Sequence, residues 1–354
     1  MRRKVIFGRL LICQQIVRYH PHKSYMKIPV FLLFIVWVAS CNNKKSSSPY
    51  DEILSQPPFS SITDSIRKEP GRDDLYFRRA VLLNKNNFPE PALADFRKAW
   101  SLAKKEVYAV GVSNILLEKK PDSAIVFLNE AIKEMPNSLF LPISLARSYD
   151  ALNKTDEALK VCDAILEKEP AQVNALLLQS ELLEKKGDTT GMIASLEKAY
   201  GLIPFNRGIT NKLAYQYAET KNAKALVLAD SLISKDSLKI HAEPYYIKGL
   251  YYSNINEKAR AIQLFNTTIK TDHRYLNAYI EKGKILFDQK KIADALKTFQ
   301  LANTITPSFP DAWYWIGRCQ EILGDKARAK ENYEKAFELD NTFTEAKEAA
   351  DKMK

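Results

Sequence analysis

The sequence predicts an all-α protein in which paired helices repeat along the chain and stack into a solenoid. The chain has 354 residues but only 11 Gly, which suits helices better than a sheet with many tight hairpin turns. Pro136, Pro170 and Pro204 stand 34 residues apart, and a proline at such a point ends a helix. Gly283 and Gly317 recur at the same interval. A chain of this kind grows by adding repeats rather than by enlarging one core.

The stretch 310–343 shows the repeating unit most clearly. Its pattern predicts two amphipathic helices on either side of a tight turn at Gly324. Large residues such as Trp313 and Tyr333 supply apolar area, worth roughly 25 cal/mol per Å² buried. Small residues such as Gly317 and Ala329 stand where two helix backbones must come close. This pattern resembles the tetratricopeptide repeat (TPR), a family of helical hairpins with a period of about 34 residues.

The resemblance covers 60–354 and implies a right-handed α-solenoid of about eight TPR helix-turn-helix repeats with a C-terminal capping helix. A lone helix at 60–69, with Ser60 or Ser61 as its N-cap, is expected to shield the first repeat. The fifth repeat is irregular, because Ala225 comes one residue early and the exit at 239–241 is long. The eight repeats are expected at 73–104, 105–138, 139–172, 173–206, 207–241, 242–275, 276–309 and 310–343.

The N-terminus has the pattern of an export signal. The apolar run 28–38 follows Lys27 and is too short to span a bilayer core about 30 Å thick. Val38, Ala39 and Ser40 then precede Cys41, an order that resembles the bacterial lipobox. The resemblance implies that residues 1–40 are a precursor segment, that cleavage occurs before Cys41, and that this cysteine is the lipid attachment site. Several acyl chains would anchor the protein stably to a membrane.

The regions flanking Cys41 complete the expected domain organisation. Residues 1–25 are long and mixed for a lipoprotein signal, so translation is expected to start at Met26. Residues 41–59 are polar and contain Pro49, Pro57 and Pro58. Such a composition predicts a flexible tether between the membrane and the folded part.

Charge and motifs argue against nucleic-acid binding and catalysis. The formal charge is +11, but seven basic residues and no acid lie in 1–40; the rest holds 46 Lys and Arg against 42 Asp and Glu. That balance is typical of an ordinary solvated surface. No Gly-rich phosphate loop or metal-binding motif is found, so neither an enzyme nor a cofactor or metal is expected. Cys162 and Cys319 lie five repeats apart, too far for a disulfide; Cys162 is expected in the core.

The first helix of each hairpin is expected to line a concave groove, as the TPR resemblance implies. Glu181, Asn211 and Glu281 stand at groove positions, but aromatic and basic residues are the more frequent binding anchors. Packing between neighbouring helices remains an equal alternative for the aromatic ones. The arrangement of Lys and Asn by which some TPR domains clamp a terminal carboxylate is not matched. The predicted protein-binding residues are Arg78, Arg147, Lys212, Tyr215, Tyr246, Lys284, Tyr314, Trp315 and Arg318.

Together these observations predict a non-enzymatic scaffold or adaptor lipoprotein at the bacterial cell envelope, most simply at the outer membrane. It would bind a protein or peptide partner through the groove, reach the membrane through its lipid anchor, and exist as a monomer. The alternative is a lipoprotein that captures carbohydrate or other nutrients, similar to the starch-utilisation type. Those chains are longer and carry large insertions, whereas this chain is compact and regular.

Overall fold

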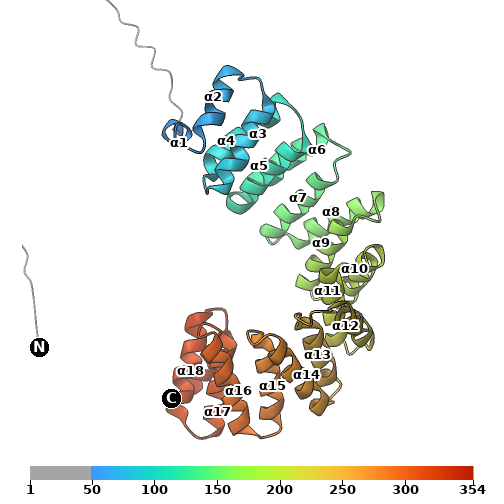
Figure 1. Ribbon diagram of the computed structural model, residues 1–354, viewed down its shortest axis with the longest axis vertical. Coiled ribbons are helices and arrows are strands. Elements are labelled where there is room, and N and C mark those ends of the chain that lie inside the picture. The colour runs from blue at the N-terminus through green and yellow to red at the C-terminus, as the bar shows by residue number, and fades with distance from the viewer. Residues whose placement is uncertain (1–48, 354) are drawn as a thin grey trace, which may run out of the picture. The chain divides into compact units, whose positions relative to one another are not determined.

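The computed structural model describes residues 49–353, and every regular element within them is a helix (Figure 1). This confirms the predicted all-α class. The described residues from Tyr50 onward form one compact unit. It begins with α1 (Asp51–Leu54) and α2 (Ser60–Lys68) and closes with α19 (Thr344–Lys352).

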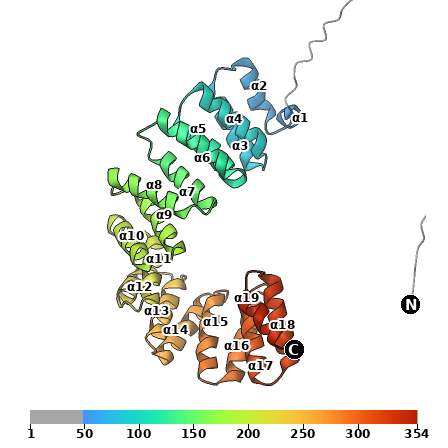
Figure 2. The same ribbon diagram turned by 180° about the vertical axis from the view of Figure 1, so that it is seen from behind.

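Eight helical hairpins lie between these end helices, in agreement with the eight expected repeats. From α2 onward, each helix packs against the next one along the chain, so the hairpins follow one another in series (Figures 1 and 2). The pairs are α3 (Asp73–Lys85) with α4 (Pro89–Leu102), α5 (Glu106–Lys119) with α6 (Pro121–Glu134), α7 (Phe140–Ala151) with α8 (Thr155–Lys168), α9 (Val173–Lys185) with α10 (Thr189–Leu202), α11 (Arg207–Glu219) with α12 (Lys224–Lys235), α13 (Glu243–Asn254) with α14 (Lys258–Thr271), α15 (Leu276–Asp288) with α16 (Ile292–Ile305), and α17 (Pro310–Ile322) with α18 (Lys326–Leu339).

The first helix of each hairpin, from α3 to α17, belongs to the inner layer of this stack. Besides its partner in the hairpin, α5 contacts α7, and α11 contacts α13; the pairs α7–α9, α13–α15 and α15–α17 also touch. The first helices of most neighbouring hairpins touch one another, so they lie closer together than the second helices do. The stack therefore bends toward the layer of first helices. We call the face formed by α3, α5, α7, α9, α11, α13, α15 and α17 the inner surface.

The predicted turn at Gly324 and the predicted helix ends at the prolines are confirmed. The turn inside most hairpins contains one residue in the left-handed region, such as Gly324 (φ 86°) in the eighth hairpin and Asn87 (φ 62°) in the first. Glycine and asparagine adopt this conformation most readily. Pro136, Pro170 and Pro204 each stand two residues beyond the end of α6, α8 and α10. Proline at this place prevents the helix from continuing.

Glycines mark close approaches between the two helices of a hairpin. A Cβ atom on Gly317 would lie 2.8 Å from the ring of Tyr333 and 3.1 Å from the carbonyl oxygen of Ala329. Gly283 faces the ring of Phe299 in the same way. A Cβ atom 2.8 Å from a ring would be closer than real side chains come, so the expected close approach at Gly317 is confirmed.

A buried ion pair joins the first hairpin to α2. Arg79 Nε and Nη2 donate to the two carboxylate oxygens of Asp95 at 2.6 and 2.8 Å, and Nη1 donates to Thr63 Oγ1 at 3.0 Å. All three side chains are buried. Burial raises the pKa of Asp95, while the neighbouring guanidinium opposes that rise.

The fifth hairpin is irregular where the sequence indicates it. Helix α12 has 12 residues, whereas most second helices have 14, and a long link leads from it to α13. The buried carboxylate of Asp236 holds this link, because it accepts a hydrogen bond from the backbone N–H of His241 at 2.9 Å. That bond lowers the pKa of Asp236.

The N-terminal boundary differs from the expectation. Leu54 and Phe59 are buried against the first hairpin, and the ring of Phe59 lies 5.7 Å from that of Phe88. The compact unit therefore begins at Tyr50, so the last part of the predicted tether is folded. The expected cap of α2 is also wrong, because Phe59 occupies the N-cap and Ser60 is already helical. The predicted signal and Cys41 lie outside the described residues.

Candidate binding surface

All nine residues predicted to bind a partner lie on the inner helices, but the structure does not bring them together into one site. They form two groups and three separate residues, Arg78, Arg147 and Tyr246. Arg78 on α3 is exposed and approaches Asp74 at 3.7 Å. Arg147 on α7 is exposed as well. The other seven residues come from α11, α13, α15 and α17.

The first group lies on α15 and α17 and combines aromatic rings with two cations. The guanidinium of Arg318 lies 5.7 Å from the ring of Trp315 and 6.0 Å from that of Tyr314, and it donates to Tyr314 Oη at 3.3 Å. Lys284 Nζ lies 5.7 Å from the same Trp315 ring. Trp315 itself stacks on Phe299 at 5.6 Å. Trp315 therefore contributes to both the core and the surface.

Tyr246 is a packing residue rather than an exposed anchor. Only 6% of its surface is exposed. Its ring lies 5.7 Å from Phe265 and 5.0 Å from Tyr275. Burial, together with nearby carboxylates, raises the pKa of its hydroxyl. The alternative of packing between neighbouring helices therefore holds for this residue.

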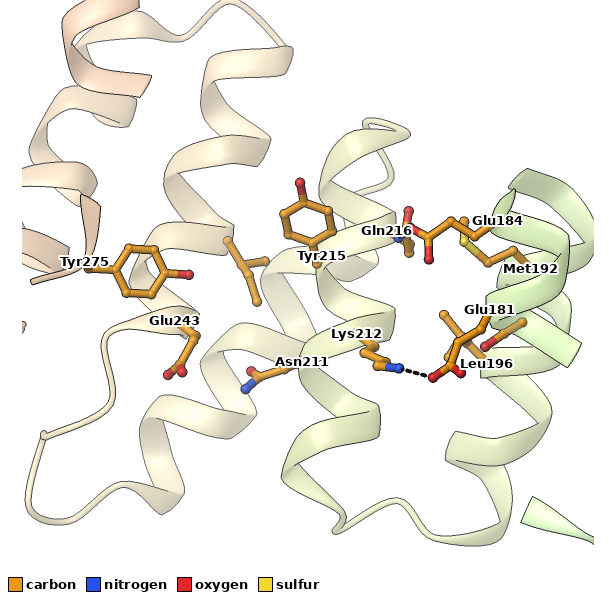
Figure 3. A pocket seen from close by; sticks show the side chains of 12 residues that line it. Glu181, Glu184, Met192, Leu196, Asn211, Lys212, Tyr215, Gln216, Glu243 and Tyr275 are labelled. Atoms are coloured by element: carbon orange, nitrogen blue, oxygen red, sulfur yellow. Dashed lines mark hydrogen bonds and ion pairs between the residues drawn. The ribbon is translucent and has the colours of Figure 1, made fainter. Parts of the chain in front are cut away.

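The second group, Lys212 and Tyr215, borders a hollow of about 340 Å³ between α9, α11 and α13, here called the central pocket. In Figure 3, Tyr275 and Glu243 approach it from one side, and Glu184 and Met192 from the opposite side. Met192, Leu196 and Ile247 are its apolar lining. The volume lies in the range of small-ligand and side-chain pockets, about 300–1,000 Å³.

Acidic side chains around this pocket outnumber the basic ones. Lys212 Nζ is paired with Glu181 at 2.8 Å. The carboxylate of Glu184 accepts one hydrogen bond, from Gln216 Nε2 at 3.3 Å, and this donor is neutral. Within the described part of the chain, neither Glu184 nor Glu243 has a cation within ion-pair distance. Lys212, one of the predicted binding residues, therefore lies among carboxylates and is already paired.

The carboxylates also act on the tyrosines of the pocket. Burial, and to a smaller extent the negative charge of Glu243, raise the pKa of Tyr275 to about 12. Burial, Glu219, Glu281 and Glu184 raise the pKa of Tyr215. Both hydroxyls therefore stay protonated near neutral pH. They offer neutral donors and ring faces in a negative environment.

Asn211 adds a buried acceptor to the pocket wall. Its Oδ1 atom is closed off from solvent and has no hydrogen-bond partner. A buried polar atom without a partner costs roughly 1–3 kcal/mol. The repeat register places Asn211, Glu181 and Glu281 at groove positions. The binding residues were predicted only from aromatic and basic side chains, so the acidic residues were missed. Counting both signs of charge on the inner helices would have indicated the acidic pocket.

Other features of the described residues are less suited to a site. A hollow of about 750 Å³ lies beside α6, α7 and α8 and is lined mainly by apolar and proline side chains such as Leu139 and Pro142. Residues 49–353 contain no group of three or more His, Cys, Asp or Glu that could hold a metal ion. None of the helices in this range has the length and apolar character needed to cross a membrane.

Comparison with known proteins links this geometry to a family of repeats. Models of the tetratricopeptide repeat match residues 116–182 and 310–343. A tetratricopeptide repeat protein from Parabacteroides merdae has a similar structure, with a TM-score of 0.59, 16% identity, and coverage of 69% of this chain and 97% of that one.

Two curated proteins show similarity in sequence. Superkiller complex protein 3 of Homo sapiens is 25% identical over 260 residues, which is 66% of this chain and 16% of that protein. Hsp70-Hsp90 organizing protein 2 of Arabidopsis thaliana is 24% identical over 233 residues, 66% of this chain and 35% of that protein. The chain thus spans about a third or less of the length of these relatives. The family models show tetratricopeptide repeats at residues 116–182 and 310–343, and the similar solved structure shows that the stacked hairpins have the fold of a TPR solenoid.

Proposed function

We propose that this protein is a non-enzymatic scaffold that binds a protein partner along the inner surface of its repeats. One observation carries the proposal: rings and charges remain accessible on the inner helices after the hairpins have stacked. Tyr215 keeps 38% of its surface exposed, and the side chains of Lys284 and Arg318 each keep 37%. Aromatic and Arg side chains are enriched among residues that dominate binding free energies.

Two further facts support binding rather than catalysis. The names of the curated relatives describe a component of a complex and an organiser of two other proteins. The cysteines of the repeats are poor nucleophiles, because burial raises the pKa of Cys162 and Cys319 to about 12. A thiol attacks only as its thiolate, so neither side chain is prepared for nucleophilic chemistry at neutral pH.

Crosslinking in living cells tests the scaffold proposal. A photoreactive amino acid would replace Tyr215 or Arg318 on the inner surface. Matched controls would carry it at Val126 on α6 or Val227 on α12, which are exposed by 62% and 68% on the outer helices. We expect one defined protein to be trapped from the inner positions only. Equal trapping from both layers, or none from either, would count against binding on the inner surface.

The membrane part of the proposal rests on the sequence around Cys41. We propose acylation of this residue and anchoring at the cell envelope, most simply the outer membrane, with translation starting at Met26. A chain begun at Met26 should incorporate an alkyne-labelled fatty acid and sediment with membranes, whereas Cys41→Ser should do neither. Unchanged labelling of the Cys41→Ser variant would exclude a lipobox. This result would leave the scaffold proposal open, because the two tests use different parts of the chain.

A further inference from the structure

The central pocket combines three features that rarely meet on a surface made only for packing. It is a hollow of about 340 Å³ whose wall includes the apolar side chains of Met192, Leu196 and Ile247. It is bordered by the rings of Tyr215 and Tyr275, and carboxylates stand on two opposite sides of it (Figure 3). Packing alone would require neither the carboxylates nor the empty volume.

The charges of the pocket define what it can accept. The lining contains three carboxylates, those of Glu181, Glu184 and Glu243, and one cation, that of Lys212. Lys212 is paired with Glu181. Two carboxylates therefore remain for a ligand. A cation bound in the pocket would lie between these two carboxylates and be attracted by both.

The acidic character continues along the inner surface beyond the pocket. Glu219 lies near Tyr215, and burial raises the pKa of its carboxyl group. Glu281 interacts with both Tyr215 and Glu219, although it pairs with Lys284 at 2.7 Å. An acidic peptide would be repelled by the carboxylates of Glu184, Glu219 and Glu243, which have no ion-pair partner in the described residues. A basic segment would be attracted by these carboxylates on α9, α11 and α13.

The rings of Tyr215 and Tyr275 favour a guanidinium over a simple ammonium ion. A guanidinium is flat, so it can stack on an aromatic face while its edge donates to a carboxylate. It carries five N–H donors, and the carboxylates of Glu184 and Glu243 supply acceptors at the pocket. The side chain of arginine also has an apolar stem that suits contact with Met192 and Ile247.

We propose that the central pocket binds an arginine side chain of a basic segment in the protein partner. This inference rests on the proposed scaffold function and adds the chemical class of its partner. The arginine enters between Tyr215 and Tyr275, and its charge is balanced by Glu184 and Glu243. Flanking basic residues of the partner lie near Glu219, on the acidic part of the inner surface next to the pocket.

A small probe tests the pocket without knowledge of the partner. The probe is N-acetyl-arginine-N-methylamide, and its control is the citrulline analogue, which has nearly the same shape but no charge. The full chain would be labelled with ¹³C at the methyl groups of methionine and isoleucine, so that Met192 and Ile247 report on the pocket by NMR. We expect saturable shifts at these two residues with the arginine probe, weakened by added salt. The affinity for the citrulline probe should be at least about tenfold lower than that for the arginine probe.

Variants with neutral side chains locate the interaction. The double variant Glu184→Gln, Glu243→Gln should reduce affinity for the arginine probe at least about tenfold. The control, Glu157→Gln with Glu331→Gln, removes the same charge from two exposed positions on α8 and α18 and should bind like the parent chain. Thermal melting would verify that all chains are folded. Equal shifts with both probes, or equal affinity of both double variants, would overturn the proposal.

The crosslinking experiment separates this inference from the function on which it rests. If Glu184→Gln, Glu243→Gln still traps the same partner at parent yield, the scaffold function stands and the arginine pocket is wrong. If the parent chain traps nothing while the arginine probe binds to the pocket, the scaffold proposal fails instead. Loss of partner trapping in this variant alone supports both.

Discussion

The ion pair of Arg79 and Asp95 shows how single residues hold the end of the stack. Both charges are buried, and each carboxylate oxygen accepts a hydrogen bond from the guanidinium. Thr63 accepts a third bond and thereby connects α2 to the first hairpin. A buried charge that loses its partner remains unsolvated, whereas apolar replacement of both charges is often neutral.

We therefore expect unequal effects from single and double substitution of this pair. Asp95→Leu should lower the free energy of unfolding by about 3–5 kcal/mol, because it leaves the Arg79 charge buried and unpaired. Arg79→Met combined with Asp95→Leu should recover most of that loss. Urea unfolding followed by circular dichroism measures both. A double variant as unstable as the single one would show that the pair contributes net stability beyond mutual compensation.

The contact between Gly317 and Tyr333 gives a second prediction at this scale. Gly317→Leu would force its side chain into the Tyr333 ring and the Ala329 carbonyl, so we expect a loss of about 1–3 kcal/mol or more by overpacking. Gly201 on α10 is the matched control, because a Cβ there would meet nothing within 4 Å. Gly201→Leu should be neutral or stabilise slightly through helix propensity. Equal melting temperatures of the two variants would contradict the close approach.

At the scale of helices, the turn residues explain why the hairpins could be predicted and α1 could not. Gly324 and Pro136 act locally, so their effect is visible in the sequence. Helix α1 has only four residues, too few for a periodic pattern, and it is followed by Pro57 and Pro58. Leu54 and Phe59 are buried in the same core cluster as the first hairpin, and no local signal in the sequence reveals that burial.

The link between α12 and α13 should respond to acid. The N–H of His241 lowers the pKa of Asp236 in the folded chain below its unfolded value of about 4. The unfolded chain then binds more protons in acid, so this contribution is full above pH 4 and is lost as pH falls through the folded pKa. We expect urea midpoints to fall between pH 6 and pH 3, and to fall less in Asp236→Asn. The same acid dependence in both chains would contradict this role.

At the scale of the whole solenoid, the candidate site was only partly predictable. The repeat register placed Lys212 and Tyr215 on the inner surface, which the structure confirms. It could not show that Lys212 would be paired with Glu181 one repeat earlier. It also could not show that Tyr246 would be covered by Tyr275. Both outcomes depend on how far apart neighbouring hairpins lie, and that distance is set by packing rather than by the period.

The same nearest-neighbour organisation predicts how damage spreads. Each hairpin contacts mainly the hairpins beside it, so its stability is a sum of its own contribution and those of its neighbours. Gly317→Leu should increase native-state amide exchange in α15, α16, α17, α18 and α19 and leave α3 to α8 unchanged. Asp95→Leu should give the reverse pattern, with faster exchange in α2 to α5 and unchanged α15 to α18. Mass spectrometry of peptic fragments measures both chains in one experiment. Faster exchange throughout, in either variant, would mean that the eight hairpins open as one unit and that the stack behaves as a single cooperative core.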